Sequence, residues 1–137
     1  MKTYVDSSAF AKRFVDEPGS DKIESVCARA SQLGLSVICV PEVISALNRR
    51  RRERSVTKCQ YAEAKRHLLD DIRDADIISL TVPVVSSAIA VLEKSPIRAM
   101  DALHIACAIE WGAHVFVSSD KKQLKAARRA GMKTHQV

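Results

Sequence analysis

Four acidic residues follow apolar segments of the chain or lie inside one: Asp6, Glu42, Asp101 and Asp120. Carboxylate oxygens are the ligands that Mg²⁺ and Mn²⁺ prefer, whereas Zn²⁺ favours His and Cys. Carboxylates that converge repel one another, so they stay fully ionised when a cation lies among them. A metal ion held in this way can activate a water molecule and stabilise charge on a phosphate. These residue types therefore indicate metal-dependent cleavage of a phosphodiester.

Asp101 is the acid that helix capping explains least. It lies in the segment 99–109, which is apolar nearly all round. A helix of that composition is expected to be buried, and a buried carboxylate without a partner is costly. A place in the first turn of the helix, or an ion pair with Arg98 or His104, is the alternative explanation. A bound divalent cation would remove the cost.

The other three acids have structural explanations when each is taken alone. Asp6 could cap the helix that follows it. Glu42 and Asp120 could lie in first turns of helices, where a carboxylate gains about 0.3–1 kcal/mol. Each of the three, however, follows an expected strand, and side chains beyond the carboxyl ends of parallel strands gather at one edge of a sheet. We therefore expect Asp6, Glu42 and Asp120 to share that edge.

The order of apolar and polar segments predicts elements that alternate along the chain. Expected strands cover residues 3–5, 36–40, 77–80, 115–117 and 132–135; expected helices cover 7–15, 20–32, 56–75, 84–92, 99–111 and 121–130, with one more running from Pro41 into the arginine run. Such alternation predicts an α/β fold in which helices flank both faces of a mainly parallel β-sheet. No linker interrupts the pattern, so we expect a single domain over residues 1–137.

Composition narrows the class of partner. The net charge of +6 favours a polyanion such as nucleic acid, although many basic proteins bind none. Aromatic residues make up only 4%, so a nucleic acid would be held by its backbone and shape rather than by stacked bases. No apolar run resembles a signal peptide or a membrane span. Four cysteines without zinc-like spacing suit a reducing compartment, and we expect a cytoplasmic protein.

The segments around the four acids resemble blocks of one known family. In chain order these segments are Tyr4–Ala9, Pro41–Leu47, Asp101–Ala106, and Val117–Asp120 with Leu124. Together they resemble the PIN-domain family, and specifically the VapC ribonuclease toxins of type II toxin–antitoxin modules. The resemblance covers essentially the whole chain, and the block that begins at Asp101 is the most specific of the four.

The resemblance implies a function and the residues that perform it. It implies an endoribonuclease whose four acids bind Mg²⁺ or Mn²⁺, an RNA substrate, a cognate antitoxin that blocks the groove, and a homodimer. Ser118 falls where threonine is commoner and keeps a hydroxyl that can support a metal ligand. Ser8 would support Asp6 in the same way. Both serines could instead be turn or cap residues.

Two basic segments are candidates for contact with RNA or antitoxin. Arg49, Arg50 and Arg52 extend the helix that begins beside Glu42. Consecutive residues splay around a helix, so the run cannot face one phosphate groove as a whole. A solvated, basic helix end is the alternative explanation. Lys121 opens a second segment, whose other cations are Lys122, Lys125, Arg128 and Arg129.

Other functions fit the sequence less well. A phosphoacceptor such as a receiver domain needs an acidic pair near the first strand, but Asp6 is followed by two serines. A haloacid-dehalogenase-type phosphatase would need a second Asp at Ser8. A pure binding module should have lost an acid. A PIN nuclease of RNA processing or DNA flap cleavage stays open. His104 is expected to be a packed or hydrogen-bonded histidine, with a proton shuttle as the alternative.

Overall fold

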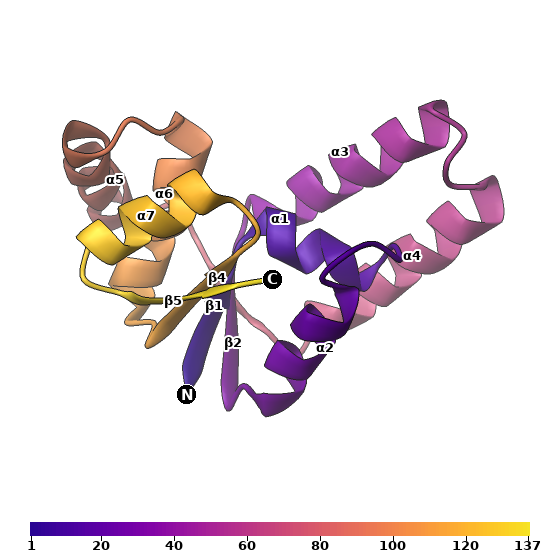
Figure 1. The fold of residues 1–137 in the computed structure, drawn as a ribbon, viewed down its shortest axis with the longest axis horizontal. Coiled ribbons are helices and arrows are strands. Elements are labelled where there is room, and N and C mark those ends of the chain that lie inside the picture. Colours follow the sequence, from indigo (N-terminus) through magenta and orange to yellow (C-terminus); the bar gives the residue numbers. More distant parts are fainter.

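In the computed structural model, which describes all 137 residues, five parallel strands form one sheet in the order β3-β2-β1-β4-β5 (Figure 1). The strands are β1 (Lys2–Val5), β2 (Gln32–Ser36), β3 (Asp76–Ile78), β4 (Val115–Ser118) and β5 (Lys133–Gln136). The helices are α1 (Ser7–Phe10), α2 (Ser20–Arg29), α3 (Cys39–Arg52), α4 (Lys58–Asp71), α5 (Val82–Lys94), α6 (Ala99–Trp111) and α7 (Lys121–Arg129), with the 3-10 helix η1 (Ala11–Arg13) after α1. The predicted α/β fold with a parallel sheet is confirmed.

Helices cover both faces of the sheet, as predicted. Successive residues of a strand point to opposite faces. Tyr4 and Phe116 therefore belong to the core beneath α5, α6 and α7, while Val5 and Val117 belong to the core beneath α1 to α4. Figure 1 shows these two groups of helices on opposite sides of the sheet. The central strands β1 and β4 are buried on both faces, which makes them a rigid base for whatever follows their carboxyl ends.

A hairpin of two long helices, α3 and α4, projects from one side of the sheet (Figure 1). Thr57 and Gln60 form a capping box that begins α4, since the side-chain oxygen of each residue accepts from the backbone N–H of the other. Ala64 and Leu68 are buried on the face of α4 that the sequence predicts to be apolar. None of the seven helices combines the length and the apolar composition that a membrane crossing requires.

The second strand lies earlier in the chain than the sequence predicts. The expected strand at 36–40 is wrong, because β2 spans Gln32–Ser36 and α3 already begins at Cys39. The aromatic ring of Trp111 packs over Gly34, and a Cβ at Gly34 would lie 2.6 Å from ring atom Cζ3. Gly34 is therefore a strand residue that admits a close neighbour. Cys39 and Val40 contribute apolar surface to α3.

Several helix boundaries also differ from the expected ones. The segment expected as one helix at 7–15 divides into α1 and η1, the helix expected at 20–32 ends at Arg29, and the helix expected at 56–75 spans Lys58–Asp71. The helix α6 covers residues 99–111, as predicted. Gly112, with φ of +77°, ends α6 in the left-handed conformation that favours glycine.

Candidate active site at the carboxyl edge of the sheet

The four acids of the sequence prediction lie at the carboxyl edge of the sheet. Asp6 directly follows β1, and its backbone N–H donates to the carbonyl of Val117 in β4. Asp120 follows β4 and is the N-cap of α7. Glu42 and Asp101 lie in the first turns of α3 and α6. Two acids are thus placed by adjacent strands and two by helix beginnings.

Asp6 is the buried acid of the site, with 3% of its surface exposed. Its Oδ1 accepts from the backbone N–H of Ala9, and the Ser8 hydroxyl lies 2.9 Å from both carboxylate oxygens. The Ser118 hydroxyl lies 2.8 Å from Oδ2. Burial raises the pKa of Asp6 to about 6, although His104 and these three donors favour the ionised form. Both serines that the sequence singles out therefore contact this carboxylate.

Glu42 is held by a buried histidine. Nε2 of His104 lies 2.6 Å from Oε1 of Glu42, and the Ser7 hydroxyl donates to the same oxygen at 2.7 Å. On the other side of the ring, Nδ1 lies 2.7 Å from the hydroxyl of Tyr4. A carboxylate only accepts, so Nε2 donates to Glu42, and in a neutral ring Nδ1 accepts from Tyr4. Burial would raise the pKa of Glu42, but the hydrogen bonds and charge of His104, with Ser7, bring it below its ordinary value.

His104 is 2% exposed and belongs to this hydrogen-bonded chain, as the sequence predicts for a packed histidine. The sequence does not indicate Ser7 or the hydroxyl of Tyr4 as parts of the site. Ser7 stands next to Asp6, and only the fold shows that its hydroxyl turns to Glu42. Tyr4 lies in the expected strand 3–5, and its ring packs against Phe116 in the core.

Asp101 is more open than the sequence predicts. The expectation that its carboxylate is buried is wrong: Asp101 is half-buried, because it lies in the first turn of α6, where the helix emerges at the sheet edge. The alternative of an ion pair with Arg98 or His104 is not found, because no charged nitrogen lies within 4 Å of the carboxylate of Asp101. Partial burial and the negative charges of Asp120 and Glu42 raise its pKa, against the opposing charges of His104 and Arg98. Asp101 therefore lies within the electrostatic field of two other acids.

The carboxylate oxygens that no protein group engages are the ones open to a cation. Asp101 has no hydrogen-bond donor on either oxygen, and Asp120 uses only Oδ1, which accepts from the backbone N–H groups of Lys122 and Gln123. Glu42 uses only Oε1. All-oxygen ligands that repel one another suit Mg²⁺ or Mn²⁺. In this conformation, however, no three His, Cys, Asp or Glu side chains form a group that could hold a metal. The donor chemistry fits a divalent ion, and binding one by three or more of these side chains would require them to move closer together.

The basic residues that the sequence singles out have different surroundings. Arg49 lines a hollow of about 320 Å³ together with Glu42. Arg50 forms an ion pair with Glu17, which engages its guanidinium. Arg52 is exposed near the tip of the α3–α4 hairpin. Lys121 is exposed beside Asp120. Of the four, Arg49 and Lys121 lie next to acids of the site.

Known proteins resemble this chain both in sequence and in fold. The PIN domain family profile matches residues 3–129. "Ribonuclease VapC45" of Mycobacterium tuberculosis is 29% identical over 109 residues, which cover 80% of this chain and 76% of that protein. Two solved structures share the fold over almost the whole length of both chains. VapBC2 from Rickettsia felis, bound to a DNA fragment from its promoter, has a TM-score of 0.72 at 14% identity, covering 100% of this chain and 99% of that one.

The second solved structure is VapC20 of Mycobacterium tuberculosis, described as a Sarcin-Ricin loop cleaving toxin. Its TM-score is 0.72 at 17% identity, covering 98% of this chain and 99% of that one. At these identities the structural likeness concerns the fold, whereas the family profile spans nearly the whole sequence, including all four acids of the sheet edge. This chain belongs to the PIN domain family.

Proposed function

We propose that this protein is a ribonuclease toxin of the VapC kind, which hydrolyses RNA phosphodiester bonds with the help of Mg²⁺ or Mn²⁺ held by Asp6, Glu42, Asp101 and Asp120. The observation that carries the proposal is the placement of these acids: Asp6 and Asp120 follow the adjacent strands β1 and β4, and Glu42 and Asp101 lie in the first turns of α3 and α6. The charges of Asp120 and Glu42 also act on Asp101 and raise its pKa. The names of the similar ribonuclease and of the loop-cleaving toxin support RNA as the substrate. An RNA substrate in turn favours the cytoplasm as the compartment.

The protein's own side chains would divide the work at this edge. Ser8 and Ser118 hold the carboxylate of Asp6 in place. Ser7 and His104 hold one oxygen of Glu42, so the other oxygen keeps a fixed direction. When bound, a divalent ion would supply Lewis acidity, lowering the pKa of water and stabilising charge on phosphate oxygens.

An antitoxin is the proposed protein partner. Two lines support it: the solved structures with this fold include VapBC complexes, and a basic chain of net charge +6 favours acidic partners. By this proposal the antitoxin covers the edge where the acids lie and so excludes RNA.

A second copy of the chain is the other proposed partner. Four apolar side chains on one side of α5, spaced three and four residues apart, are exposed: Val82 by 79%, Val85 by 47%, Ile89 by 53% and Leu92 by 39%. A stripe with this spacing is the pattern by which helices pack against each other. The same stripe on a two-fold related copy would cover it.

Cleavage of RNA by the purified protein tests the proposal. Structured RNA should be cut in Mg²⁺ or Mn²⁺ and should stay intact when a chelator is present. Asp6→Asn and Asp101→Asn should each abolish the cut, whereas Asp74→Asn, an exposed acid outside the site, should not. Cleavage that survives both chelation and the two site substitutions would refute the proposed function.

Growth of a bacterial host tests the toxin part separately. Expression of the wild-type protein should arrest growth, and expression of Asp101→Asn at an equal level should not. Cleavage in the test tube without any growth arrest would support a PIN nuclease of RNA processing over a toxin.

A further inference from the structure

A groove lined by positive charge runs along α7, the helix that Asp120 caps. It has a volume of about 310 Å³ and lies between the loop Ser95–Ile97 and one side of α7. The cations on its wall are Lys122, Lys125 and Arg129, and none of the residues that line it is acidic. Their spacing of three and four residues places them on one face of the helix.

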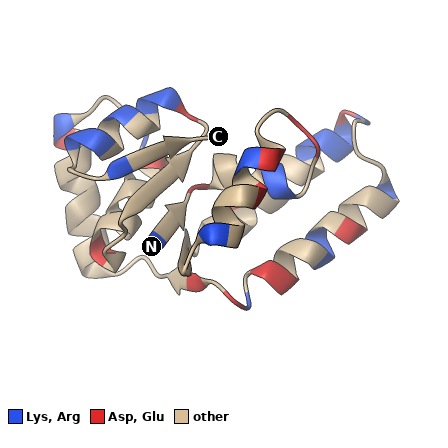
Figure 2. Cartoon of the chain, turned by 60° about the horizontal axis from the view of Figure 1, so that its bottom comes forward, with Lys and Arg blue, Asp and Glu red and all other residues tan.

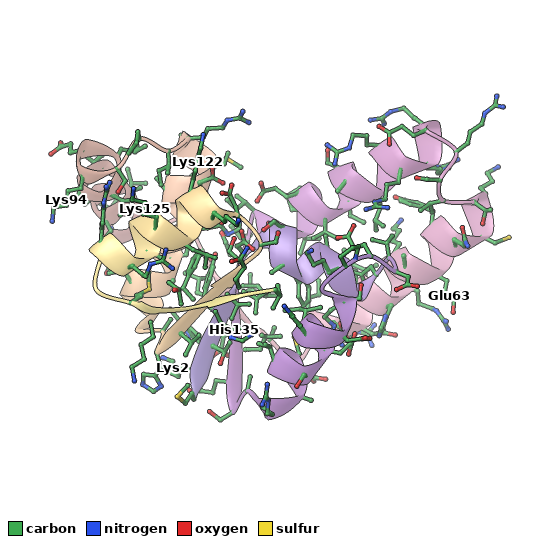
Figure 3. The ribbon with its side chains drawn as sticks, viewed as in Figure 1. Lys2, Glu63, Lys94, Lys122, Lys125 and His135 are labelled. Carbon is green, nitrogen blue, oxygen red and sulfur yellow. The ribbon has the colours of Figure 1, made fainter.

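The three cations of the α7 groove are free of acidic partners. No carboxylate of the protein lies within 4 Å of a charged nitrogen of Lys122, Lys125 or Arg129. Arg129 instead donates to the backbone carbonyl of Lys94, which keeps its charge at the groove wall. Figure 2 shows Lys and Arg following one another along α7, and Figure 3 places Lys94, Lys122 and Lys125 at the same end of the molecule. The charge of this face is therefore left for a ligand.

One end of the groove is close along the chain to two acids of the site, Asp101 and Asp120. Asp120 is the N-cap of α7, two residues before Lys122. The loop on the opposite wall leads within a few residues into the first turn of α6, which carries Asp101. At the start of α7, the side-chain N–H of Gln123 donates to the backbone carbonyl of Asp101, which connects α7 to the first turn of α6. From Asp120 to Arg129 the helix extends about 13 Å, enough for a strand to continue from the acids past several cations.

The arginine run of the α3–α4 hairpin offers a weaker surface. Arg50 is engaged by Glu17, and the guanidinium of Arg51 lies over the ring of Tyr61 at 5.3 Å from its centroid. Arg52 stands ten residues after Glu42, which is about 15 Å along the axis of α3. Its charge is accompanied by that of the neighbouring Glu53.

We propose that the α7 groove binds the phosphate backbone of an RNA strand whose scissile phosphate lies at the four acids. This inference rests on the proposed function and adds the path that the strand takes away from the site. No aromatic side chain lines the groove, so its contacts go to phosphates rather than to stacked bases. Binding in the groove is consequently independent of RNA sequence and sensitive to salt.

The test compares two triple variants that remove the same charge. Lys122→Gln/Lys125→Gln/Arg129→Gln neutralises the α7 groove, and Arg52→Gln/Lys58→Gln/Lys65→Gln neutralises three exposed cations of the hairpin. Binding of a fluorescein-labelled, mixed-sequence single-stranded RNA of roughly 20 nucleotides is followed by anisotropy in chelator, over about 50 to 300 mM KCl. Chelation separates binding from cleavage, and thermal melting confirms that both variants fold.

Loss of three phosphate contacts should make the negative slope of log K against log salt shallower by about 2, and affinity near 0.1 M salt should fall roughly 100-fold. The hairpin variant should keep the wild-type slope within about 1. Equal losses in the two variants, or a wild-type slope in the α7 variant, would overturn the groove proposal. In that case a wild-type protein that still cleaves RNA would leave the proposed function intact.

Discussion

Asp6 dominates the electrostatics of the site at the scale of single residues. It is the most buried of the four acids, and three neighbouring donors only partly offset the cost of its charge. The sequence indicates Asp6 by its place after a strand, but it does not show that Asp6 is buried. The two serines that contact Asp6, Ser8 and Ser118, are 110 residues apart in the chain, so only the fold brings them together around the carboxylate. The most costly charge of the site is thus created by the meeting of β1 and β4.

The pH dependence of stability should reveal this cost. The pKa of Asp6 is about 6 in the folded protein against an ordinary value of 3.8, so the folded state binds the proton more tightly than the unfolded chain. The stability that this proton contributes is present at low pH and is lost as the pH rises through 6. For the metal-free protein we expect a loss of roughly 2 kcal/mol between about pH 4.5 and pH 7.5, specific to Asp6.

Urea unfolding of the wild type and of Asp6→Asn, in chelator at both pH values, measures this loss. Asp6→Asn should not lose stability in this way. The difference in the free energy of unfolding between the two proteins should therefore change by roughly 2 kcal/mol between the two pH values. Stability curves that stay parallel across this range would show that Asp6 titrates as it does in the unfolded chain.

The chain of hydrogen bonds from Tyr4 through His104 to Glu42 should be energetically coupled. Tyr4→Phe removes the hydroxyl, and His104→Leu removes both ring nitrogens. Because each substitution takes away the partner of the other, the double variant should lose less stability than the two single losses added together. We expect a coupling of about 1 kcal/mol or more from a double-mutant cycle in urea. Losses that add within about 0.3 kcal/mol would mean that the 2.7 Å contact contributes nothing.

The elements that position the site were predictable to different degrees. Residues 99–111 form α6 as predicted, since an apolar segment of this length between Pro96 and Gly112 favours a buried helix. The sequence predicts the second strand too late in the chain, because the run Ser36–Val40 is more apolar than β2 at Gln32–Ser36. Local composition also does not show that Trp111 packs over Gly34. The sheet edge was still predicted correctly, because the order of strands and acids survives a shift of a few residues.

The contact between Gly34 and Trp111 gives a prediction for β2. Gly34→Ala places a methyl group within 2.6 to 2.8 Å of three ring atoms, so the ring or the strand must move. We expect a loss of about 1–3 kcal/mol in the free energy of unfolding. In a Trp111→Leu background the same substitution should cost markedly less. An equal cost in both backgrounds would show that the ring does not constrain this strand.

At the scale of the whole molecule, two surfaces remain uncovered by the fold. The α7 groove carries unpaired positive charge, and the stripe of α5 carries exposed apolar side chains. The sequence indicates the basic residues of α7, but only the packing of the loop Ser95–Ile97 against the helix shows that three of them line a groove. It likewise predicts a helix near α5 without showing which of its apolar residues the core leaves exposed.

The stripe of α5 predicts that the protein is a dimer. Sedimentation should give a mass of twice 15.1 kDa for the wild type. Ile89→Glu places a charge in the middle of the stripe and should yield a monomer, because an unpaired buried charge is costly at an interface. Ala90→Glu, which introduces the same charge about a quarter turn around the helix, should remain dimeric. A dimeric Ile89→Glu protein would exclude this stripe as the interface.

Calorimetric titration of Mn²⁺ into the purified protein tests the central claim most directly, because it measures the ion at the acids without any substrate. The carboxylate of Asp101 has no hydrogen-bond partner within the protein, so Asp101→Asn should leave the fold intact while removing a ligand. The account predicts saturable binding by the wild type and by Asp74→Asn, and affinity at least tenfold weaker for Asp101→Asn. Equal affinity in all three proteins, or no binding by the wild type, would contradict it.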